Sequence, residues 1–416
     1  MSTAGEPYFD AGGTLYSPRY GDRYHGAADA IGESRHVFLA PNRLPRRWQE
    51  HQRPLFTLVE LGFGTGLNFL VTWREWQRHR RQHGGVCRRL HYLALERHPL
   101  RRRQLQRALA AHPELADLAD RLTAAWSDTA TELQTLWFDD DHLSLTVWQA
   151  DALAMLEQLD ADSGPGVDGW YLDGFAPDRN PAMWQPSIFA QMARLSAAGA
   201  RFGTFTAAGR VRRALADAGF AVARQPGFGN KREMLAGTWP DNAPDRGARP
   251  WFAAARYPAP GRVAIVGAGL AGAATALALA RRGVDCTVVD GAGPAAGASG
   301  NPAGTLYPRL ARQLDPATRL SLQAMDRAWA RLGELERAGA TVRHGQQGAL
   351  LRIEPGEEQP RQVDIAATDY ALERGLALLD ADAASERSGC KLDWPALWVP
   401  GGGWADPGGL TRAQLA

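Results

Sequence analysis

The sequence predicts an α/β protein with two domains, each built on a parallel sheet that binds a nucleotide-like ligand at its carboxyl edge. Three observations predict this. The chain has 416 residues, more than one ordinary domain holds. Short apolar runs alternate with helical patterns, as a parallel sheet with crossover helices requires. A glycine-rich turn follows an apolar run twice, at residues 62–66 and 267–272.

The composition is that of a globular protein. With 45% hydrophobic and 22% charged residues, it excludes disordered, collagen-like and disulfide-stapled classes. The formal charge of +2 does not by itself indicate nucleic-acid binding. Cys87, Cys286 and Cys390 are too widely spaced for a disulfide framework or a zinc motif, so we expect no metal and a reducing compartment. The N-terminus lacks the pattern of a secretory signal, which favours the cytoplasm.

A proline-rich segment divides the chain. Residues 240–261 contain five prolines and show no apolar periodicity, which is typical of a linker. We therefore expect a first domain over residues 1–245, a linker over 246–260 and a second domain over 261–416. The uncharged run Val263–Ala280 is long enough to span a membrane, but it is rich in alanine and its first half is typical of a buried strand. We therefore expect no membrane helix.

Seven apolar runs of the first domain are expected to be strands. Seven is the number typical of the Rossmann-like sheet of S-adenosylmethionine (SAM) methyltransferases. Between the last parallel strand and the edge strands, Val211, Ala214, Leu215 and Ala218 recur at helical spacing, and Gly219 is expected to end that helix. The expected strands are residues 57–62, 90–96, 143–149, 170–173, 202–206, 221–224 and 233–239.

The first glycine turn lies in Glu60–Asn68, which reads ELGFGTGLN. Its glycines allow a sharp turn and leave bare main chain for a ligand to approach. The spacing is GxGxG and not the GxGxxG that places a pyrophosphate on a helix N-terminus, which favours SAM, a ligand without phosphate. The expected SAM-binding residues of this motif are Glu60, Gly62, Gly64, Gly66 and Asn68.

Two further acids follow the next strands. Glu96 ends the second strand, where a carboxylate can accept hydrogen bonds from both ribose hydroxyls. Asp151 follows the third strand, where it can accept a hydrogen bond from the adenine amine. The alternative interpretation is a tight turn accompanied by two helix-capping acids.

Asp173 follows the fourth strand and is the candidate catalytic residue. The carboxyl edge of a central strand faces the ligand crevice of an open α/β sheet. A carboxylate there can act as general base for an amine that attacks a methyl sulfonium, or it can cap the following turn. Nearby aromatic side chains can form a wall for a flat substrate or belong to the core, and amide and cationic groups can donate to it. These candidate substrate residues are Phe175, Asn180, Trp184, Lys231 and Arg232.

The second glycine turn lies in Arg262–Gly272, which reads RVAIVGAGLAG. Gly267, Gly269 and Gly272 form a GxGxxG between an apolar strand and a helical pattern. The next strand ends in Asp290, which can accept from a ribose hydroxyl. This is the complete βαβ fingerprint of a dinucleotide site.

Four stretches of the first domain together resemble one family. They are residues 17–48, ELGFGTGLNF, DGFAPDRNPAMW and GFGNKREML. They are similar to the methyltransferase half of the bifunctional bacterial tRNA 5-methylaminomethyl-2-thiouridine biosynthesis proteins, over most of residues 8–240. The resemblance implies that the partner is tRNA, that the substrate is an aminomethyl-uridine at the wobble position, and that Asp173 takes a proton from its amine. Tyr24-His25 and Ala150-Asp151 depart from the family pattern.

The second domain resembles the other half of the same family. Residues 297–304, with Ser299 and Asn301, resemble the loop under the flavin ring in amine oxidases of the D-amino-acid oxidase type, which implies FAD. In that family this half removes a carboxymethyl group from the amine that the first half then methylates. Pro302 and Asp290 depart from the usual residues. Because only 156 residues follow from Gly261, we expect an incomplete FAD domain, with methylation retained and amine oxidation lost or impaired.

Eleven arginines lie between Arg74 and Arg107, against only two acids. They are either a phosphate footprint for tRNA or the solvated face of helices in an arginine-rich chain. Two other functions remain open. One is a small-molecule N-methyltransferase fused to a flavin amine oxidase, and the other is a tRNA-binding derivative without catalytic activity. The sequence predicts no particular protein partner.

Overall fold

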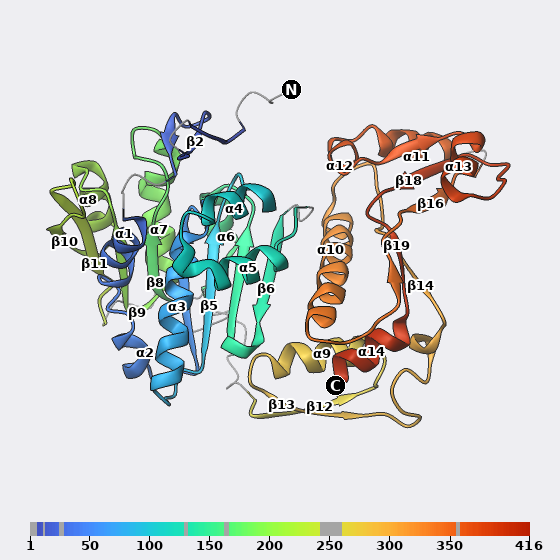
Figure 1. The fold of residues 1–416 in the computed structure, drawn as a ribbon, viewed down its shortest axis with the longest axis horizontal. Coiled ribbons are helices and arrows are strands. Elements are labelled where there is room, and N and C mark those ends of the chain that lie inside the picture. The colour runs from blue at the N-terminus through green and yellow to red at the C-terminus, as the bar shows by residue number, and fades with distance from the viewer. Residues whose placement is uncertain are drawn as a thin grey trace, which may run out of the picture. The chain divides into compact units, whose positions relative to one another are not determined.

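The computed structural model divides into two compact units, Met1–Pro258 and Ala259–Ala416 (Figure 1). The structure describes residues 6–10, 13–24, 29–128, 132–161, 166–241, 260–354 and 358–416. Of the expected linker over 246–260, only Pro260 belongs to the described residues.

The first unit is built on an eight-stranded sheet, in the order β10-β11-β9-β8-β4-β5-β7-β6. The five central strands, from β9 to β7 in this order, pair in parallel, whereas β11 runs antiparallel to β9 and to β10. All seven predicted runs form strands of this sheet. They are β4 (Leu55–Leu61), β5 (Arg89–Leu95), β7 (Leu143–Trp148), β8 (Val167–Leu172), β9 (Ser196–Thr204), β10 (Ala221–Pro226) and β11 (Glu233–Thr238).

The eighth strand, β6 (Leu133–Phe138), is absent from the sequence prediction. It pairs antiparallel with β7 at one edge of the sheet, and only Leu136 and Phe138 of its side chains are buried. Because an edge strand covers the core with alternate residues, it has no continuous apolar run to reveal it. The strand ends also differ by one residue, so that Gly62, Glu96 and Asp173 lie just after their strands.

Helices cover both faces of the sheet (Figure 1). Neighbouring residues of one strand point to opposite faces, so Leu58 of β4 packs in one core and Val59 in the other. The first core includes side chains of α3 and α5, and the second includes side chains of α6, α7 and α8. The helices of this unit are α1 (Ala30–Ser34), α2 (Arg46–Glu50), α3 (Leu67–Gln82), α4 (Arg102–Leu109), α5 (Ala116–Ala125), α6 (Ala152–Gln158), α7 (Pro186–Leu195) and α8 (Gly209–Asp217).

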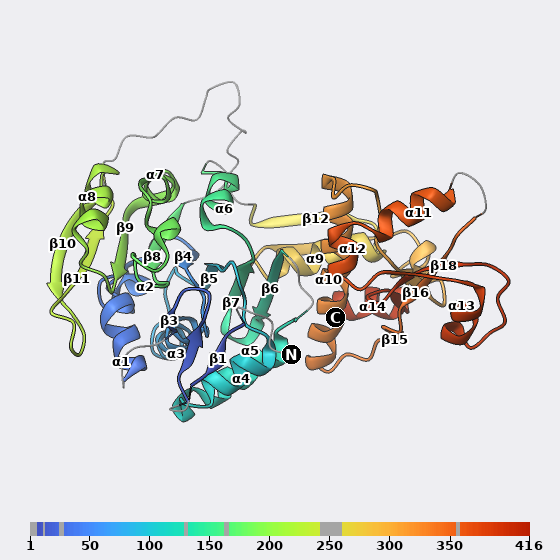
Figure 2. The same cartoon turned by 90° about the horizontal axis from the view of Figure 1, so that it is seen from above.

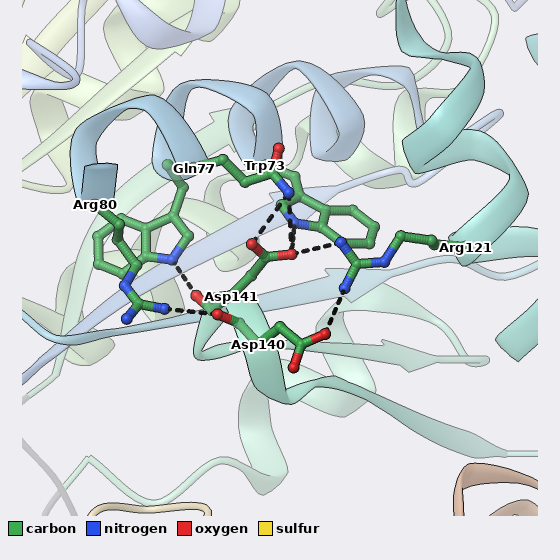
Figure 3. A network of polar contacts seen from close by, with 7 residues as sticks. Trp73, Gln77, Arg80, Arg121, Asp140 and Asp141 are labelled. Atoms are coloured by element: carbon green, nitrogen blue, oxygen red, sulfur yellow. Dashed lines mark hydrogen bonds and ion pairs between the residues drawn. The ribbon is translucent and has the colours of Figure 1, made fainter. Parts of the chain in front are cut away.

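Asp141 ties the turn between β6 and β7 to the helices of one face (Figure 3). Its side chain is 13% exposed, and it ends the short 3-10 turn Asp139–Asp141. The neighbouring Asp140 carbonyl accepts from Arg80 at 3.1 Å, which adds a second link to α3. The donors to Asp141 are Trp73 Nε1 (2.9 Å), Gln77 Nε2 (3.0 Å) and Arg121 Nη1 (2.7 Å) to the carboxylate, and Trp76 Nε1 (2.7 Å) to the main-chain carbonyl.

A small antiparallel sheet precedes α1. It consists of β1 (Tyr8–Phe9), β2 (Leu15–Ser17) and β3 (Asp22–Arg23). The turn between β2 and β3 and the residue after β3 carry Tyr20 and Tyr24, which reach the carboxyl edge of the large sheet.

The second unit begins with a βαβ element, in which β12 (Arg262–Val266) and β13 (Asp285–Val289) are parallel and α9 (Leu270–Ala280) connects them (Figure 1). Figure 2 shows α9 beside β12 from above. The uncharged run Val263–Ala280 is thus divided between a strand and a helix. In the described residues, no helix combines the length and the apolar character needed to cross a membrane. Within α9, Ala273 and Ala276 are buried whereas Ala274 is exposed.

The rest of the second unit forms two small antiparallel sheets, in the orders β14-β19-β15 and β16-β18-β17. The last helix, α14, packs against α9. The strands are β14 (Gly304–Leu306), β15 (His344–Gly345), β16 (Ala349–Arg352), β17 (Ala377–Leu379), β18 (Ala396–Val399) and β19 (Gly403–Ala405); the helices are α10 (Pro316–Arg337), α11 (Glu358–Ala366), α12 (Asp369–Glu373), α13 (Ala381–Ser388) and α14 (Pro407–Leu415).

Candidate active site

A cleft opens at the carboxyl edge of the large sheet, where the loops after β4, β5, β7 and β8 meet. Parallel strands bring the residues that follow them to one edge, which is why loops far apart in the sequence share this cleft. Six of the predicted SAM-binding and catalytic residues line it. They are Gly62, Gly64, Asn68, Glu96, Asp151 and Asp173.

The glycine turn after β4 has the backbone that the motif predicts. The φ angles of Gly62, Gly64 and Gly66 are 92°, 53° and 76°, in the left-handed region that disfavours side chains. A Cβ on Gly62 would lie 3.1 Å from the Gly174 Cα, so the turn packs directly against the loop after β8. Gly66 lies outside the lining and begins α3 beside the Phe63 ring. Bare main chain at Gly62 and Gly64 therefore fits a ligand such as SAM.

Glu96 and Asp151 line the cleft and are also bound to the backbone. Glu96 accepts from the Gly64 N–H at 3.1 Å and from the His98 N–H at 2.8 Å, which ties it to the glycine turn. Burial raises the pKa of Glu96. Asp151 caps α6 by accepting from the Leu153 N–H at 3.1 Å. The two interpretations of these acids are thus compatible, since each has a structural contact and also lines the cleft.

Asp173 lies where the cleft meets a second cavity, because it lines both. Its Oδ1 accepts from the Gly174 N–H at 2.8 Å, and its Oδ2 accepts from Asn68 Nδ2 at 2.7 Å. Burial raises the pKa of Asp173 to about 6, although both hydrogen bonds oppose the rise. At neutral pH the carboxyl is ionised, and it is a stronger base than an exposed aspartate.

The second cavity has a volume of about 280 Å³ and lies between α1, the loop after β8 and the loop between β10 and β11. Lys231, a predicted substrate residue, lines it and lies 2.9 Å from Glu33 Oε1. Its Nζ is also 4.5 Å from the centroid of the Phe205 ring. Glu33 and Phe205 are not among the predicted residues. No local signal marks Glu33, whose contact with Lys231 joins residues 198 positions apart.

Aromatic rings form one wall of the cleft. Phe175 stacks on Tyr20 with ring centroids 4.5 Å apart and meets Tyr24 edge-on at 5.3 Å. Asn180 lines the cleft as well. Burial raises the pKa of Tyr24, so its hydroxyl stays protonated. The predicted wall therefore exists, but Tyr20 and Tyr24 supply the part that was assigned to Trp184.

Besides Gly66, three predicted residues of the first unit line neither cavity. Trp184 is 6% exposed and belongs to the core, where its Nε1 donates to the Phe175 carbonyl at 3.0 Å and supports that loop from behind. Arg232 is exposed and absent from both linings. Glu60 is fully buried under Asn68, because its position in β4 turns its side chain below the cleft floor.

The arginine cluster does not form one face. Arg78 and Arg80 lie near the C-terminal end of α3, which begins at the carboxyl edge, so they lie at the opposite edge from the cleft. Arg97 follows β5 and lines the cleft. Several members have partners in the first unit. These contacts are Arg74 with Asp117 (3.6 Å), Arg78 with Glu75 (2.8 Å) and Arg101 with Glu6 (3.8 Å).

The GxGxxG of the second unit also has the predicted backbone. Gly267 has φ 103°, and a Cβ on Gly272 would lie 1.8 Å from the Gly267 carbonyl oxygen, so only glycine permits the close approach of helix and strand. Asp290 accepts from the Ala268 N–H at 2.8 Å, and its backbone hydrogen bonds lower its pKa. This turn fits a dinucleotide, which needs bare backbone at a helix N-terminus.

Two residues of the following loop differ in their placement. The Ser299 Oγ accepts from the Leu270 N–H at 3.0 Å, so it caps the N-terminus of α9 next to Gly269. Asn301 is exposed. Ser299 is thus brought to the nucleotide motif itself.

Two family models match the chain. One is described as an S-adenosyl-L-methionine-dependent methyltransferase and covers residues 113–240, and the other as an FAD dependent oxidoreductase and covers residues 262–416. The cofactors of the two matched families are SAM and FAD. The boundary between the two matches coincides with the division into two units.

Curated relatives match nearly the whole chain. The tRNA 5-methylaminomethyl-2-thiouridine biosynthesis bifunctional protein MnmC of Chromohalobacter salexigens is 41% identical over 96% of this chain and 56% of its own length. The protein of the same name from Pseudomonas savastanoi pv. phaseolicola is 41% identical over 98% of this chain and 61% of its own length. The chain therefore spans less than two thirds of these relatives.

Among solved structures, that of MNMC2 from Aquifex aeolicus is 20% identical and covers 60% of this chain and 75% of its own, with a TM-score of 0.45. The sequence relationship is much closer than this structural one, and it extends through both units. The chain thus belongs to the family of the tRNA 5-methylaminomethyl-2-thiouridine biosynthesis bifunctional proteins.

Proposed function

We propose that the first unit methylates the amine of a 5-aminomethyl-uridine, with or without a 2-thio group, at the wobble position of tRNA. One observation carries the proposal: the Asp173 carboxylate lies where the SAM-type cleft and the second cavity meet. A methyl donor in the first and an amine in the second would both border the same base. The relatives' printed name, which describes biosynthesis of 5-methylaminomethyl-2-thiouridine in tRNA, names the product of such a methylation.

Methyl transfer from SAM to an amine requires the protein to orient the two reactants and to accept a proton. SAM, when bound in the cleft, supplies a methyl group on its sulfonium. Asp173 accepts the proton that the amine loses as its nitrogen bonds to the methyl carbon and the carbon–sulfur bond breaks. The hydrogen bonds from Gly174 and Asn68 hold the carboxylate in one orientation for this transfer.

The cleft residues have separate proposed roles. Gly62 and Gly64 offer bare main chain to SAM, Glu96 accepts from its ribose, and Asp151 accepts from its adenine. Phe175 and Tyr20 provide a stacked pair against which a flat base can lie. In the second cavity, Lys231 and Glu33 place a cation and an anion next to the incoming uridine.

For the second unit we propose that the βαβ element binds the adenosine diphosphate part of FAD. Gly267, Gly269 and Gly272 would accommodate the pyrophosphate, and Asp290, Ser299 and Asn301 lie on the loops around it. In the family, this half removes the carboxymethyl group from 5-carboxymethylaminomethyl-uridine. We propose that these 416 residues alone do not support that oxidation, because β12 and β13 form a two-stranded sheet with exposed apolar side chains.

The direct test of the first proposal is transfer of labelled methyl from SAM to tRNA that lacks the wobble modification. The expected result is labelled 5-methylaminomethyl-uridine at the wobble position. Activity should fall steeply as salt rises, because tRNA binding releases counterions from phosphates. Absence of label in tRNA, together with methylation of a small amine that is insensitive to salt, would replace this function by small-molecule N-methylation.

A further inference from the structure

A second carboxyl group lies beneath Asp173 and takes no part in the proposed proton transfer. Glu60 is in β4, its side chain is 0% exposed, and it lines neither cavity. A carboxyl group is costly to bury unless its charge is removed or compensated. The groups that most affect the pKa of Glu60 are Asp173, Asn68, Tyr92 and Glu96, and none of these four is a cation.

Asn68 joins Glu60 to Asp173. Its Nδ2 donates to Glu60 Oε1 at 2.7 Å and to Asp173 Oδ2 at 2.7 Å. An amide nitrogen has two hydrogens, and both are used here. In the reversed orientation the amide oxygen would face two carboxyl groups, which is favourable only if both carry a proton. The orientation of Asn68 therefore depends on both acids at once.

The other oxygen of Glu60 is close to a second polar group. Glu60 Oε2 and the Tyr92 hydroxyl are both buried, and hydrogen bonding between the two side chains affects the pKa of each. A protonated Oε2 that donates to the Tyr92 oxygen and a Tyr92 hydroxyl that donates to an ionised Oε2 would both satisfy this pair. The complete burial of Glu60, one amide group away from the Asp173 carboxylate, favours the protonated form. Burial and the charge of Asp173 raise the pKa of Glu60 well above its usual value, in agreement with that proton.

We propose that Glu60 is a positioning residue that acts as a neutral acid. It holds the Asn68 amide so that one N–H always points at Asp173 Oδ2, and it leaves Asp173 as the single ionised member of the pair. The consequence for catalysis rests on the proposed methyl transfer. The arrangement of the two acids and the amide does not, since it can be measured in the resting protein.

Several groups around Asp173 determine the pH at which it loses its proton. Besides Asn68 and Gly174, Asp173 is influenced by Glu33 from α1, which raises its pKa, and by Lys231 from the loop between β10 and β11, which lowers it. A Glu60 that keeps its proton while Asp173 titrates adds no charge to these influences. A change at Glu60 should therefore reach Asp173 only through Asn68.

Substitution of Glu60 by glutamine shows whether Glu60 is protonated or ionised in the protein. Glu60→Gln keeps an acceptor oxygen for Asn68 and is neutral, so the acid limb of the pH–kcat profile should keep its wild-type midpoint. If Glu60 were ionised in the protein, Gln would remove a negative neighbour, the midpoint would move to lower pH, and the proposal would be overturned.

Glu60→Leu removes the acceptor. Asn68 is then free to reverse, and kcat should fall about tenfold to a hundredfold, the value of a hydrogen bond to a charged group. KM for SAM should stay constant, and the acid limb should move to higher pH, because the Asn68 hydrogen bond lowers the pKa of Asp173. In an Asn68→Leu background, Glu60→Leu should have no further effect on kcat. Additive losses would contradict an action through Asn68.

Val59→Ala is the matched control. Val59 is the neighbouring residue of β4, is also 0% exposed and packs in the core on the opposite face of the sheet. Its replacement by alanine therefore weakens the packing of the strand without changing a contact of Asn68. Its acid limb should remain at the wild-type midpoint, which separates positioning from general destabilisation of β4. If Glu60→Leu does not fold, the Glu60→Gln midpoint alone decides, since a shift overturns the proposal and its absence supports it.

A measurement without turnover distinguishes failure of this proposal from failure of the proposed function. The full chain with ¹³C-labelled aspartate carboxyls is titrated by NMR, and the Asp173 signal is assigned by its loss in Asp173→Asn. Its midpoint should be near 6 in the wild type and in Glu60→Gln, and higher in Glu60→Leu. If tRNA is not methylated but these midpoints are observed, the positioning role of Glu60 is supported and the proposed function is wrong. If methylation occurs but the Asp173 midpoint is the same in Glu60→Leu and the wild type, the positioning role of Glu60 is wrong.

Discussion

The two glycine turns of this chain have similar local geometry in very different surroundings. In the first unit the turn follows β4, a central strand of eight whose last four residues are all buried. In the second unit the turn follows β12, one of only two paired strands, in which Val266 is 91% exposed, and Val289 of β13 is 54% exposed. A βαβ element thus forms from local sequence, whereas a complete site depends on the strands that flank it.

The neighbours make the difference at the level of single residues. In the first unit, the loops after three further strands add Glu96, Asp151 and Asp173 to the glycine turn. In the second unit, the side chains of Asp290 and Ser299 accept hydrogen bonds from the backbone of the turn. We therefore expect variants of the first unit to affect chemistry and variants of the second to affect ligand retention.

The largest effect is expected at the catalytic base. Asp173→Asn keeps the shape of the side chain but cannot take a proton, so kcat for methyl transfer should fall about a hundredfold to ten-thousandfold. Binding of SAM, measured by calorimetry, should change little. A variant that methylates tRNA as fast as the wild type would remove Asp173 from the mechanism.

The next effect concerns the stability of the first unit. Asp141→Ala removes the acceptor for Trp73, Gln77 and Arg121 and leaves the buried Trp73 indole N–H without its partner. We expect a loss of about 2–4 kcal/mol in the free energy of unfolding of that unit, seen as a lower first transition in calorimetry. The control is Asp140→Asn, whose side chain is 96% exposed and should leave the transition in place.

Flavin retention measures the difference between the two turns most simply. A polypeptide of these 416 residues should be purified with less than stoichiometric flavin, judged from its absorbance band, while it binds SAM at one site. Gly272→Ala should abolish the remaining flavin, because its Cβ would lie 1.8 Å from the Gly267 carbonyl oxygen. A full flavin complement that turns over the carboxymethylated substrate would contradict the proposed loss of oxidation.

The smallest effect concerns tRNA binding by the divided arginine cluster. Arg97 lines the cleft, whereas Arg81 is exposed near the end of α3 at the opposite edge. Arg97→Ala should raise KM for tRNA and lower the salt dependence by about one counterion. Arg81→Ala, a matched removal of one charge, should change neither. Equal effects of the two variants would support a tRNA footprint that extends over both edges.

Much of this architecture could be predicted from the sequence because central parallel strands are buried on both faces and appear as continuous apolar runs. The acids that directly follow those runs, Glu96, Asp151 and Asp173, could be placed at the cleft for the same reason. The edge strand β6 lacked such a run and was missed. Strands that are buried on both faces can therefore be predicted from the sequence, whereas an edge strand such as β6, which is defined by its pairing with β7, cannot.

The site residues that were misplaced share one cause, which is contact between distant segments. Glu60 was expected in the cleft, but its direction within β4 turns it beneath Asn68. Trp184 was expected to face the substrate, but it fills the core behind Phe175. Glu33 was not expected at all, because only the fold brings it to Lys231. Alternation along a strand or loop does not reveal which face a cavity will occupy.

The most direct test of the central claim is the pH dependence of a single turnover of methyl transfer to tRNA. The raised pKa of Asp173, about 6, means that the base is protonated and inactive below that pH and ionised above it. The rate should therefore rise through a midpoint near 6 in the wild type, and this limb should be absent from the much slower Asp173→Asn variant. A limb with the same midpoint in both proteins would show that another group takes the proton.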